Sequence, residues 1–241
     1  MEPARAQLLD QSRRAFTRAL SPVTAPEWGW PTGCAGWTVG DLVTHVLGTT
    51  AMYTALLEGA TAAEAMSRLA SVTTSPISAS SDFRQAARAV QARLSNPDVV
   101  TGTARHPAGD VTGDGLAGYA MVEWVLHGWD LSRATCRDTV IDSGLARAVY
   151  DEILPDAERL RRLGAFGPAI PVPGDAPADV RLVALLGRMP YLIGRMPNLG
   201  RRDYWIAAPA GLACAMYGVS GECRGPFAAH QPSLRHPPRL L

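Results

Sequence analysis

Residues 116–135 restrict the fold of this chain more than any other segment, because apolar side chains cover nearly the whole circumference of a helix there. A helix with one apolar stripe lies at a surface, whereas a helix that is apolar all round must be enclosed by other elements. We therefore predict a central, buried helix over this range. Its large apolar residues are Tyr119, Met121, Val122, Trp124, Val125, Leu126, Trp129 and Leu131.

Other segments with helical periodicity supply the layer around this helix. Apolar residues at three- and four-residue spacing predict helices over residues 3–20, 39–57, 83–94, 143–163 and 178–186. Thr38 and Asp41 have the spacing of a capping box before the second of these helices, and Ser81 or Asp82 is expected to cap the third. Pro155 is expected to bend the helix over 143–163. The predicted fold class is all-α, a helical bundle.

A short insertion and a tail complete the predicted organisation. Residues 99–105 alternate weakly and contain β-branched side chains, which favours a short strand or hairpin arm between helices, and His106 is expected to be solvated. Pro and Gly interrupt the chain every few positions after residue 190. We predict that residues 1–190 form the bundle and that residues 191–241 form an irregular tail rather than a folded domain.

The charge composition argues against several classes of partner. The chain has 23 basic and 22 acidic residues without a basic cluster, so a nucleic-acid surface is not expected. Its apolar stretches are shorter than the roughly 20 residues that span a membrane, and its first residues lack a signal-peptide pattern, so we expect a cytoplasmic protein. All 23 basic residues are arginine, which excludes mechanisms that use lysine.

Three residues within the predicted helices have the chemistry of a metal site. Glu123 and His127 are four residues apart, so they project from one face of the central helix about one turn from each other. His45 lies on the inward stripe of the helix over 39–57. Two imidazoles and one carboxylate give three protein ligands and an open position, as in catalytic sites for Zn²⁺, Ni²⁺ or Fe²⁺.

Metal-free interpretations of these residues stay open at this stage. Glu123 and His127 could form an ordinary intrahelical pair, and His45 could be a hydrogen-bonded core residue. The burial of Glu123 favours a metal, because an unpaired carboxylate in an apolar environment needs a cation or a proton. Asp130, three residues after His127, could orient a ligand imidazole or cap the end of its own helix. Cys34, just ahead of the second helix, could be a thiolate, but a packing role is favoured.

Three separated segments resemble a known family. Residues 34–45, 123–135 and 172–177 with 181–188 are similar, in the same order, to actinobacterial metal-binding proteins of the mycothiol-dependent maleylpyruvate isomerase N-terminal type, within the DinB/YfiT-like superfamily. The resemblance covers roughly residues 1–190. It implies a DinB-like four-helix bundle and a divalent metal, typically Zn²⁺, held by His45, Glu123 and His127.

The resemblance also implies mycothiol, a low-molecular-weight thiol, as co-substrate. The leading hypothesis is a thiol transferase or isomerase-like enzyme that acts on a small-molecule electrophile, with a homodimer left open. The alternative is a non-catalytic metal-binding or stress-response bundle in which the ion stabilises the fold. One departure from the family pattern concerns the end of the central helix, where Cys136 replaces the usual glycine. This replacement costs on the order of 1 kcal/mol if the position needs a left-handed conformation.

Overall fold

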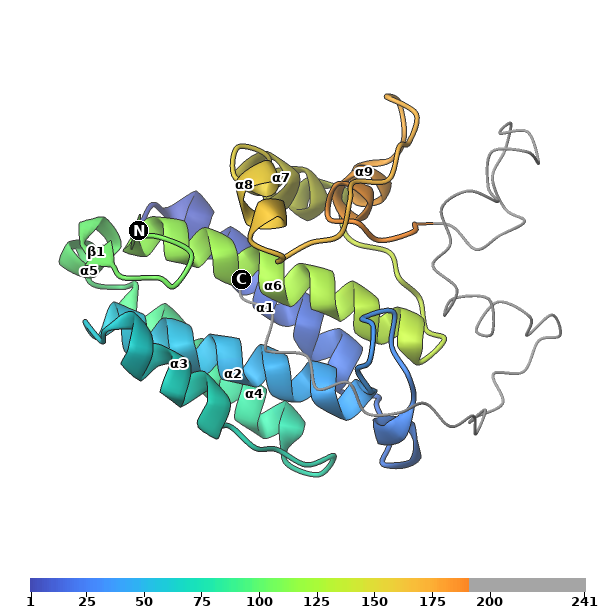
Figure 1. Ribbon diagram of the computed structural model, residues 1–241, viewed down its shortest axis with the longest axis horizontal. Helices are drawn as coiled ribbons and strands as arrows, with labels where there is room; N and C mark the ends of the chain where they lie inside the picture. Colours follow the sequence, from blue (N-terminus) through green and yellow to red (C-terminus); the bar gives the residue numbers. More distant parts are fainter. Residues whose placement is uncertain (191–241) are drawn as a thin grey trace, which may run out of the picture.

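The computed structural model describes residues 1–190, and within them the chain is all-α apart from one two-stranded hairpin. Helices α1 (Pro3–Leu20), α2 (Val39–Leu57), α4 (Ala79–Arg93) and α6 (Gly113–Ala134) form a four-helix bundle in which α1 and α2 each contact both α4 and α6 (Figure 1). The shorter α3 (Ala62–Ser71) packs along α2. The predicted all-α bundle is confirmed, while the predicted tail over 191–241 lies outside the described residues.

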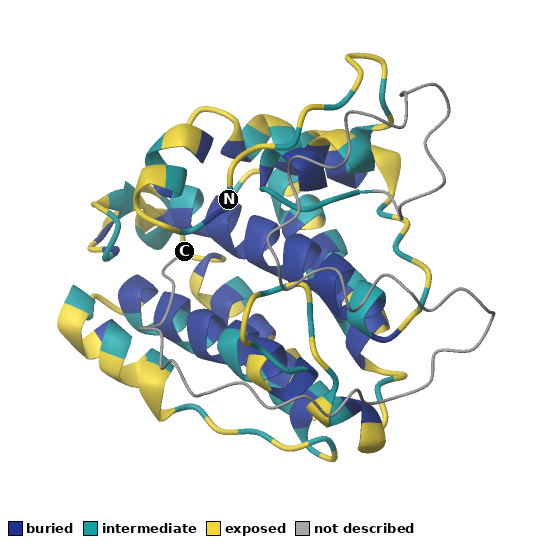
Figure 2. Cartoon of the chain, turned by 45° about the vertical axis from the view of Figure 1, so that its right-hand side comes forward, coloured by how far each residue is buried: buried dark blue, intermediate teal, exposed yellow. Residues whose placement is uncertain are grey.

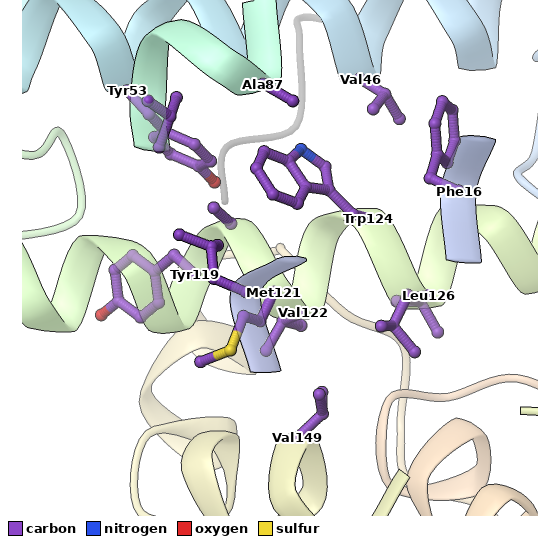
Figure 3. Close-up of a cluster of buried hydrophobic side chains, with 14 of the residues drawn as sticks. Phe16, Val46, Tyr53, Ala87, Tyr119, Met121, Val122, Trp124, Leu126 and Val149 are labelled. Atoms are coloured by element: carbon purple, nitrogen blue, oxygen red, sulfur yellow. The ribbon is translucent and has the colours of Figure 1, made fainter. Parts of the chain in front are cut away.

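Helix α6 is the buried centre of the molecule, as its apolar circumference predicts. Nearly its whole length is buried in Figure 2, and Figure 3 shows its side chains meeting those of the surrounding helices. Trp124 is fully buried; its ring packs edge-on against Phe83 of α4, and its Nε1 donates a hydrogen bond to Oγ1 of Thr50 in α2 at 3.0 Å. Burying an aromatic side chain of this kind contributes about 1.5–3 kcal/mol. None of the helices within residues 1–190 is long and apolar enough to cross a membrane.

Side-chain caps determine where the bundle helices begin. Thr38 Oγ1 accepts a hydrogen bond from the Asp41 N–H at 3.2 Å, and Asp41 Oδ2 accepts one from the Thr38 N–H at 2.9 Å. This is the predicted capping box at the start of α2. The predicted start of the third helix is wrong, because α4 begins at Ala79, before Ser81 and Asp82. Asp82 accepts a hydrogen bond from Oγ1 of Thr74 at 2.8 Å instead of capping the helix.

The insertion before α6 contains a short helix as well as a hairpin. Helix α5 (Pro97–Thr101) precedes strand β1 (Thr103–Ala104), which pairs antiparallel with β2 (Val111–Thr112). Asn96 caps α5 and Pro97 suits its first turn, so only part of the predicted strand over 99–105 is extended. The expectation of a solvated His106 is wrong: the residue is 3% exposed, and its Nδ1 accepts a hydrogen bond from the Ala108 N–H.

Three further helices lie on the opposite side of α6 from α2, α3 and α4 (Figure 1). Helices α7 (Ser143–Ile153) and α8 (Ala157–Arg162) replace the single bent helix predicted over 143–163. Pro155 lies in the interruption between them, where its missing N–H and its ring disfavour continued helix. Helix α9 (Ala178–Leu185) then packs against α7 and returns the chain toward the end of α6.

Candidate metal centre

The structure brings His45, Glu123 and His127 together. Glu123 and His127 project from successive turns of α6, and His45 faces them from α2. The distance from His45 Nε2 to Glu123 Oε1 is 2.8 Å, and the distance from His127 Nε2 to the same oxygen is 3.6 Å. One ligand atom from each residue lies within 4.8 Å of those of the other two. Glu123 is fully buried, and the side chains of His45 and His127 are 9% and 5% exposed.

Neighbouring residues hold this arrangement in place. Gly128 follows His127 and lies against α1, where a Cβ at this position would be 3.4 Å from Cα of Phe16. Thr49 lies one turn after His45 and donates a hydrogen bond to Glu123 Oε1 at 3.1 Å. Trp37, in the loop before α2, packs its ring 4.6 Å from that of His45 and 6.2 Å from that of His127, centroid to centroid. The imidazoles are therefore held by packing from a third segment.

The charges at this site depend on protons. Burial alone raises the pKa of Glu123, but the positive imidazoles of His45 and His127 lower it to about 2. Burial lowers the pKa of His127, while the Glu123 carboxylate and a hydrogen bond to Asp130 raise it to about 10. Without another cation, the proton held by His127 thus balances the charge of the buried carboxylate.

The second carboxylate oxygen of Glu123, Oε2, is better explained by a bound cation than by protonated histidines alone. His45 and Thr49 both contact Oε1 of Glu123, whereas Oε2 has no hydrogen-bond partner among residues 1–190 and is buried. An unsatisfied carboxylate oxygen in a protein interior carries a desolvation cost. Two imidazole nitrogens and a carboxylate are the donor set of many catalytic zinc sites. The residues present therefore fit a divalent metal ion with an open position.

The opposite side of the His127 ring holds a different cluster. Nδ1 of His127 lies 3.0 Å from Oδ2 of Asp130, and this oxygen accepts a hydrogen bond from Nη2 of Arg188 at 2.9 Å. Cys34 Sγ lies 3.5 Å from the same oxygen and 3.8 Å from Nη2 of Arg188. Cys34, His127 and Asp130 have the spacing of a second metal-ligand group. The guanidinium already supplies a positive charge there, so this group does not need a metal ion.

Two of these neighbours were not predicted from the sequence. Arg188 lies far along the chain from Asp130, and no local spacing links them; the available signal is its place in the third motif, directly after Gly187 at the end of a helix. Thr49 is one turn from His45, a spacing that predicts proximity to the site but not the hydrogen bond to Glu123. Asp130 contacts His127 rather than capping its own helix, which ends in backbone hydrogen bonds at residues 136 and 137.

Comparisons with known proteins place the site within a described domain. A match to the family described as "Mycothiol maleylpyruvate isomerase N-terminal domain" covers residues 9–132, which include His45, Glu123, His127 and Asp130. Two uncharacterized proteins of Mycobacterium tuberculosis, from strains CDC 1551 and H37Rv, are each 29% identical over 194 residues, 78% of this chain and 98% of theirs.

Among solved structures, the chain is similar to the mycothiol-dependent maleylpyruvate isomerase and to a histidine-to-alanine mutant of it. For each, the sequence identity is 19%, the TM-score is 0.49, and the similarity covers 67% of both chains.

Proposed function

The chain belongs to the mycothiol maleylpyruvate isomerase N-terminal domain family, and we propose that it is a divalent-metal-binding, mycothiol-dependent enzyme of the thiol transferase or isomerase-like type. Its co-substrates would be mycothiol and a small electrophile. His45, Glu123 and His127 would hold the metal, and Zn²⁺ is the ion that this donor set favours.

The observation that carries the proposal is the burial and incomplete hydrogen bonding of the Glu123 carboxylate. Its carboxylate is fully buried in the most apolar helix of the bundle, with one oxygen shared by His45 and Thr49 and the other without a hydrogen-bond partner among the described residues. A carboxylate so placed is stable only beside positive charge. Two histidines are directed at the same oxygen; His127 can supply that charge as a proton, and a divalent ion would supply it without one.

The charge of the three side chains also favours a thiolate partner. Two neutral imidazoles and one carboxylate leave a divalent ion with a net positive charge, which favours an anionic ligand at the open position. When bound, the metal would act as a Lewis acid that lowers the pKa of a thiol and so increases its nucleophilicity. Trp37 packs over both imidazole rings and keeps water from that face, which strengthens electrostatic interactions within the site.

Metal analysis of the full chain, purified without a histidine tag, tests the first part of the proposal. We expect about one Zn²⁺ per chain, as in other sites with three protein ligands and an open position. Each of His45→Ala, Glu123→Gln and His127→Ala is expected to lose the ion. His106→Gln is the matched control, because this buried histidine lies in the hairpin rather than among the three ligands, and it should retain the metal. Retention of the metal in all three ligand variants would show that the site is assigned wrongly.

An activity assay tests the second part. Zinc-loaded protein is incubated with mycothiol and a panel of small electrophiles, including unsaturated and halogenated acids, and products are followed by mass spectrometry. Turnover that disappears in Glu123→Gln and when mycothiol is omitted would support an enzyme. If zinc raises the melting temperature but no electrophile reacts, the ion has a structural role and the protein is a non-catalytic metal-binding bundle.

A further inference from the structure

Arg188 forms two hydrogen bonds with the carboxylate of Asp130. Its Nη2 donates to Oδ2 at 2.9 Å and its Nε to Oδ1 at 3.3 Å, while Nη1 donates to the backbone carbonyl of Leu186 at 3.0 Å. Asp130 is 2% exposed, so these contacts replace solvent almost completely. A two-point contact with a planar guanidinium fixes the plane of a carboxylate as well as its position.

The backbone conformation at the end of α9 places Arg188 at this position. The Arg188 N–H donates to the carbonyl of Val183, and the Gly187 N–H donates to that of Ala184, which is the hydrogen-bond pattern of a Schellman motif. Gly187 adopts a φ of 76°, and a Cβ there would lie 2.8 Å from the backbone of Gly167. The direction in which Arg188 leaves the helix is thus determined by the fold.

The fixed carboxylate in turn determines how His127 presents its ring. Nδ1 of His127 lies 3.0 Å from Oδ2 of Asp130, which favours a proton on Nδ1 that is donated to the carboxylate. When a metal ion displaces the second proton, Nε2 offers its lone pair on the side of Glu123 and His45. Carboxylate partners of this kind orient metal-binding histidines and make them stronger ligands.

We propose that Arg188 is a positioning residue for the metal centre, which acts by holding Asp130 so that His127 directs Nε2 toward the ion. This inference rests on the proposed metal site. It assigns a role to a residue beyond 9–132, the range that matches the family. The segment that carries α9 therefore contributes to metal affinity as well as to packing.

A merely structural role for Arg188 would be to attach the end of α9 to the bundle. Arg161 provides a matched control, because it also binds this end: its Nη2 donates to the carbonyl of Leu185 at 2.9 Å, and its Nε donates to that of Gly167 at 3.1 Å. Neither contact involves Asp130. Loss of Arg161 should loosen α9 without changing the orientation of His127.

The test measures zinc affinity of the full-length protein by competition with a chromophoric chelator. Arg188→Gln is expected to weaken zinc binding about 10- to 100-fold, the range measured for lost partners of ligand histidines. Arg188→Lys should recover part of the loss, since it restores the charge but not the two-point contact. Arg161→Gln should bind zinc within about twofold of wild type, since it leaves every partner of the ligands in place, even if its melting temperature falls.

A spectroscopic readout separates positioning from general destabilisation. In zinc-loaded protein labelled with ¹⁵N-histidine, the Nδ1–H of His127 should give a slowly exchanging proton signal, assigned by its absence in His127→Ala. Arg188→Gln should shift this signal and accelerate its exchange with water, because Asp130 becomes free to move. Arg161→Gln should leave the signal unchanged.

The outcomes distinguish this inference from the proposed function. If wild-type protein binds no zinc, the proposed function fails and the inference fails with it. If wild type binds zinc but Arg188→Gln matches it in affinity and in the His127 signal, the metal site stands and the role of Arg188 is refuted. Equal losses of affinity in Arg188→Gln and Arg161→Gln would also refute positioning, since docking of α9 would explain both.

Discussion

Helix α6 carries two buried carboxylates, two turns apart, that face opposite sides of one histidine. Glu123 lies on the Nε2 side of His127 with His45, and Asp130 lies on the Nδ1 side with Arg188. Glu123 is 0% exposed and Asp130 is 2% exposed, so both depend on nearby positive charge. They differ in where that charge comes from.

Asp130 is paired with a permanent cation. Burial raises the pKa of Asp130, but the guanidinium of Arg188 and the imidazole of His127 outweigh burial and hold the pKa well below its usual range. Glu123 is paired only with imidazoles, whose charge requires bound protons. The charge of Asp130, on the Nδ1 side of His127, is therefore balanced at every ordinary pH. On the Nε2 side, beside Glu123, a metal ion can replace protons. This difference favours the Glu123 side for the metal ion that we propose.

The largest expected effect comes from breaking the permanent pair. Asp130→Asn leaves the largely covered guanidinium of Arg188, whose side chain is 18% exposed, without its counter-charge, and the free energy of unfolding of metal-free protein should fall by about 3 kcal/mol. Glu123→Gln should cost less under the same conditions, because His127, whose pKa the carboxylate raises, can release its proton when the carboxylate is lost. Urea denaturation of both variants in the presence of a chelator measures the two losses. Equal losses would remove the distinction between the two carboxylates.

In the response to added zinc, Glu123→Gln should be the more strongly affected of the two variants. At a free zinc concentration about 100 times the dissociation constant, wild-type protein should gain about 2.7 kcal/mol of stability, since the ion binds the folded state. Asp130→Asn should keep part of this gain, because the three ligands remain. Glu123→Gln should show none of it, and melting curves with zinc and with a chelator give both comparisons. A full zinc response in Glu123→Gln would exclude Glu123 as a ligand.

The sequence predicts one side of this comparison better than the other. Glu123, His127 and His45 follow from helical periodicity, because an i, i+4 pair in an enclosed helix must face a neighbouring helix. The contact of Arg188 with Asp130 depends on how α9 folds back, and that return depends on the close approach of Gly187 to Gly167. Such long-range packing leaves no periodic signal in the sequence.

The helix boundaries likewise were predictable where they depend on local contacts and not where they depend on more distant ones. The start of α2 was predictable from Thr38 and Asp41, which bond to each other within one turn. The start of α4 was not, since Asp82 bonds back to Thr74 across a loop. Likewise Pro155 indicates a disturbance in the chain, but the sequence alone does not decide between a bend and the observed break between α7 and α8.

The pH dependence of zinc affinity gives a third, intermediate effect. In metal-free protein the pKa of His127 is raised from 6.5 to about 10. The stability that its pairing with Glu123 contributes is therefore fully present below pH 6.5 and is lost as pH rises through 10. Zinc must displace this proton, so its affinity should rise with pH over that window, by up to about 1.4 kcal/mol per pH unit for each proton released. Calorimetry at pH 7 in buffers of different ionisation enthalpy measures the proton release directly. Binding without proton release would mean that His127 is already neutral.

The smallest expected effect concerns the helix ends that present Asp130 and Arg188. Helices α2, α8 and α9 each end with a glycine in the left-handed region: Gly59 at φ 91°, Gly164 at φ 82° and Gly187 at φ 76°. Helix α6, which carries Asp130, ends with the same hydrogen-bond pattern, but Cys136 occupies the left-handed position at φ 55°. The condition stated for the cost of this replacement, a left-handed conformation, is thus met, and the side chain adds strain that glycine would not.

Comparing Cys136→Gly with Cys136→Ala isolates this strain. Both variants lack the sulfur atom, so any contribution of the sulfur cancels, and the difference between them is one Cβ at a positive φ. The glycine variant should be more stable than the alanine variant by about 1 kcal/mol, or about 2–4 °C in melting temperature. Zinc affinity should be equal in the two, because Asp130 lies more than a turn before the strained residue and keeps its contacts with Arg188 and His127. A difference in zinc affinity would instead show that the end of α6 transmits its strain to the Asp130 side of His127.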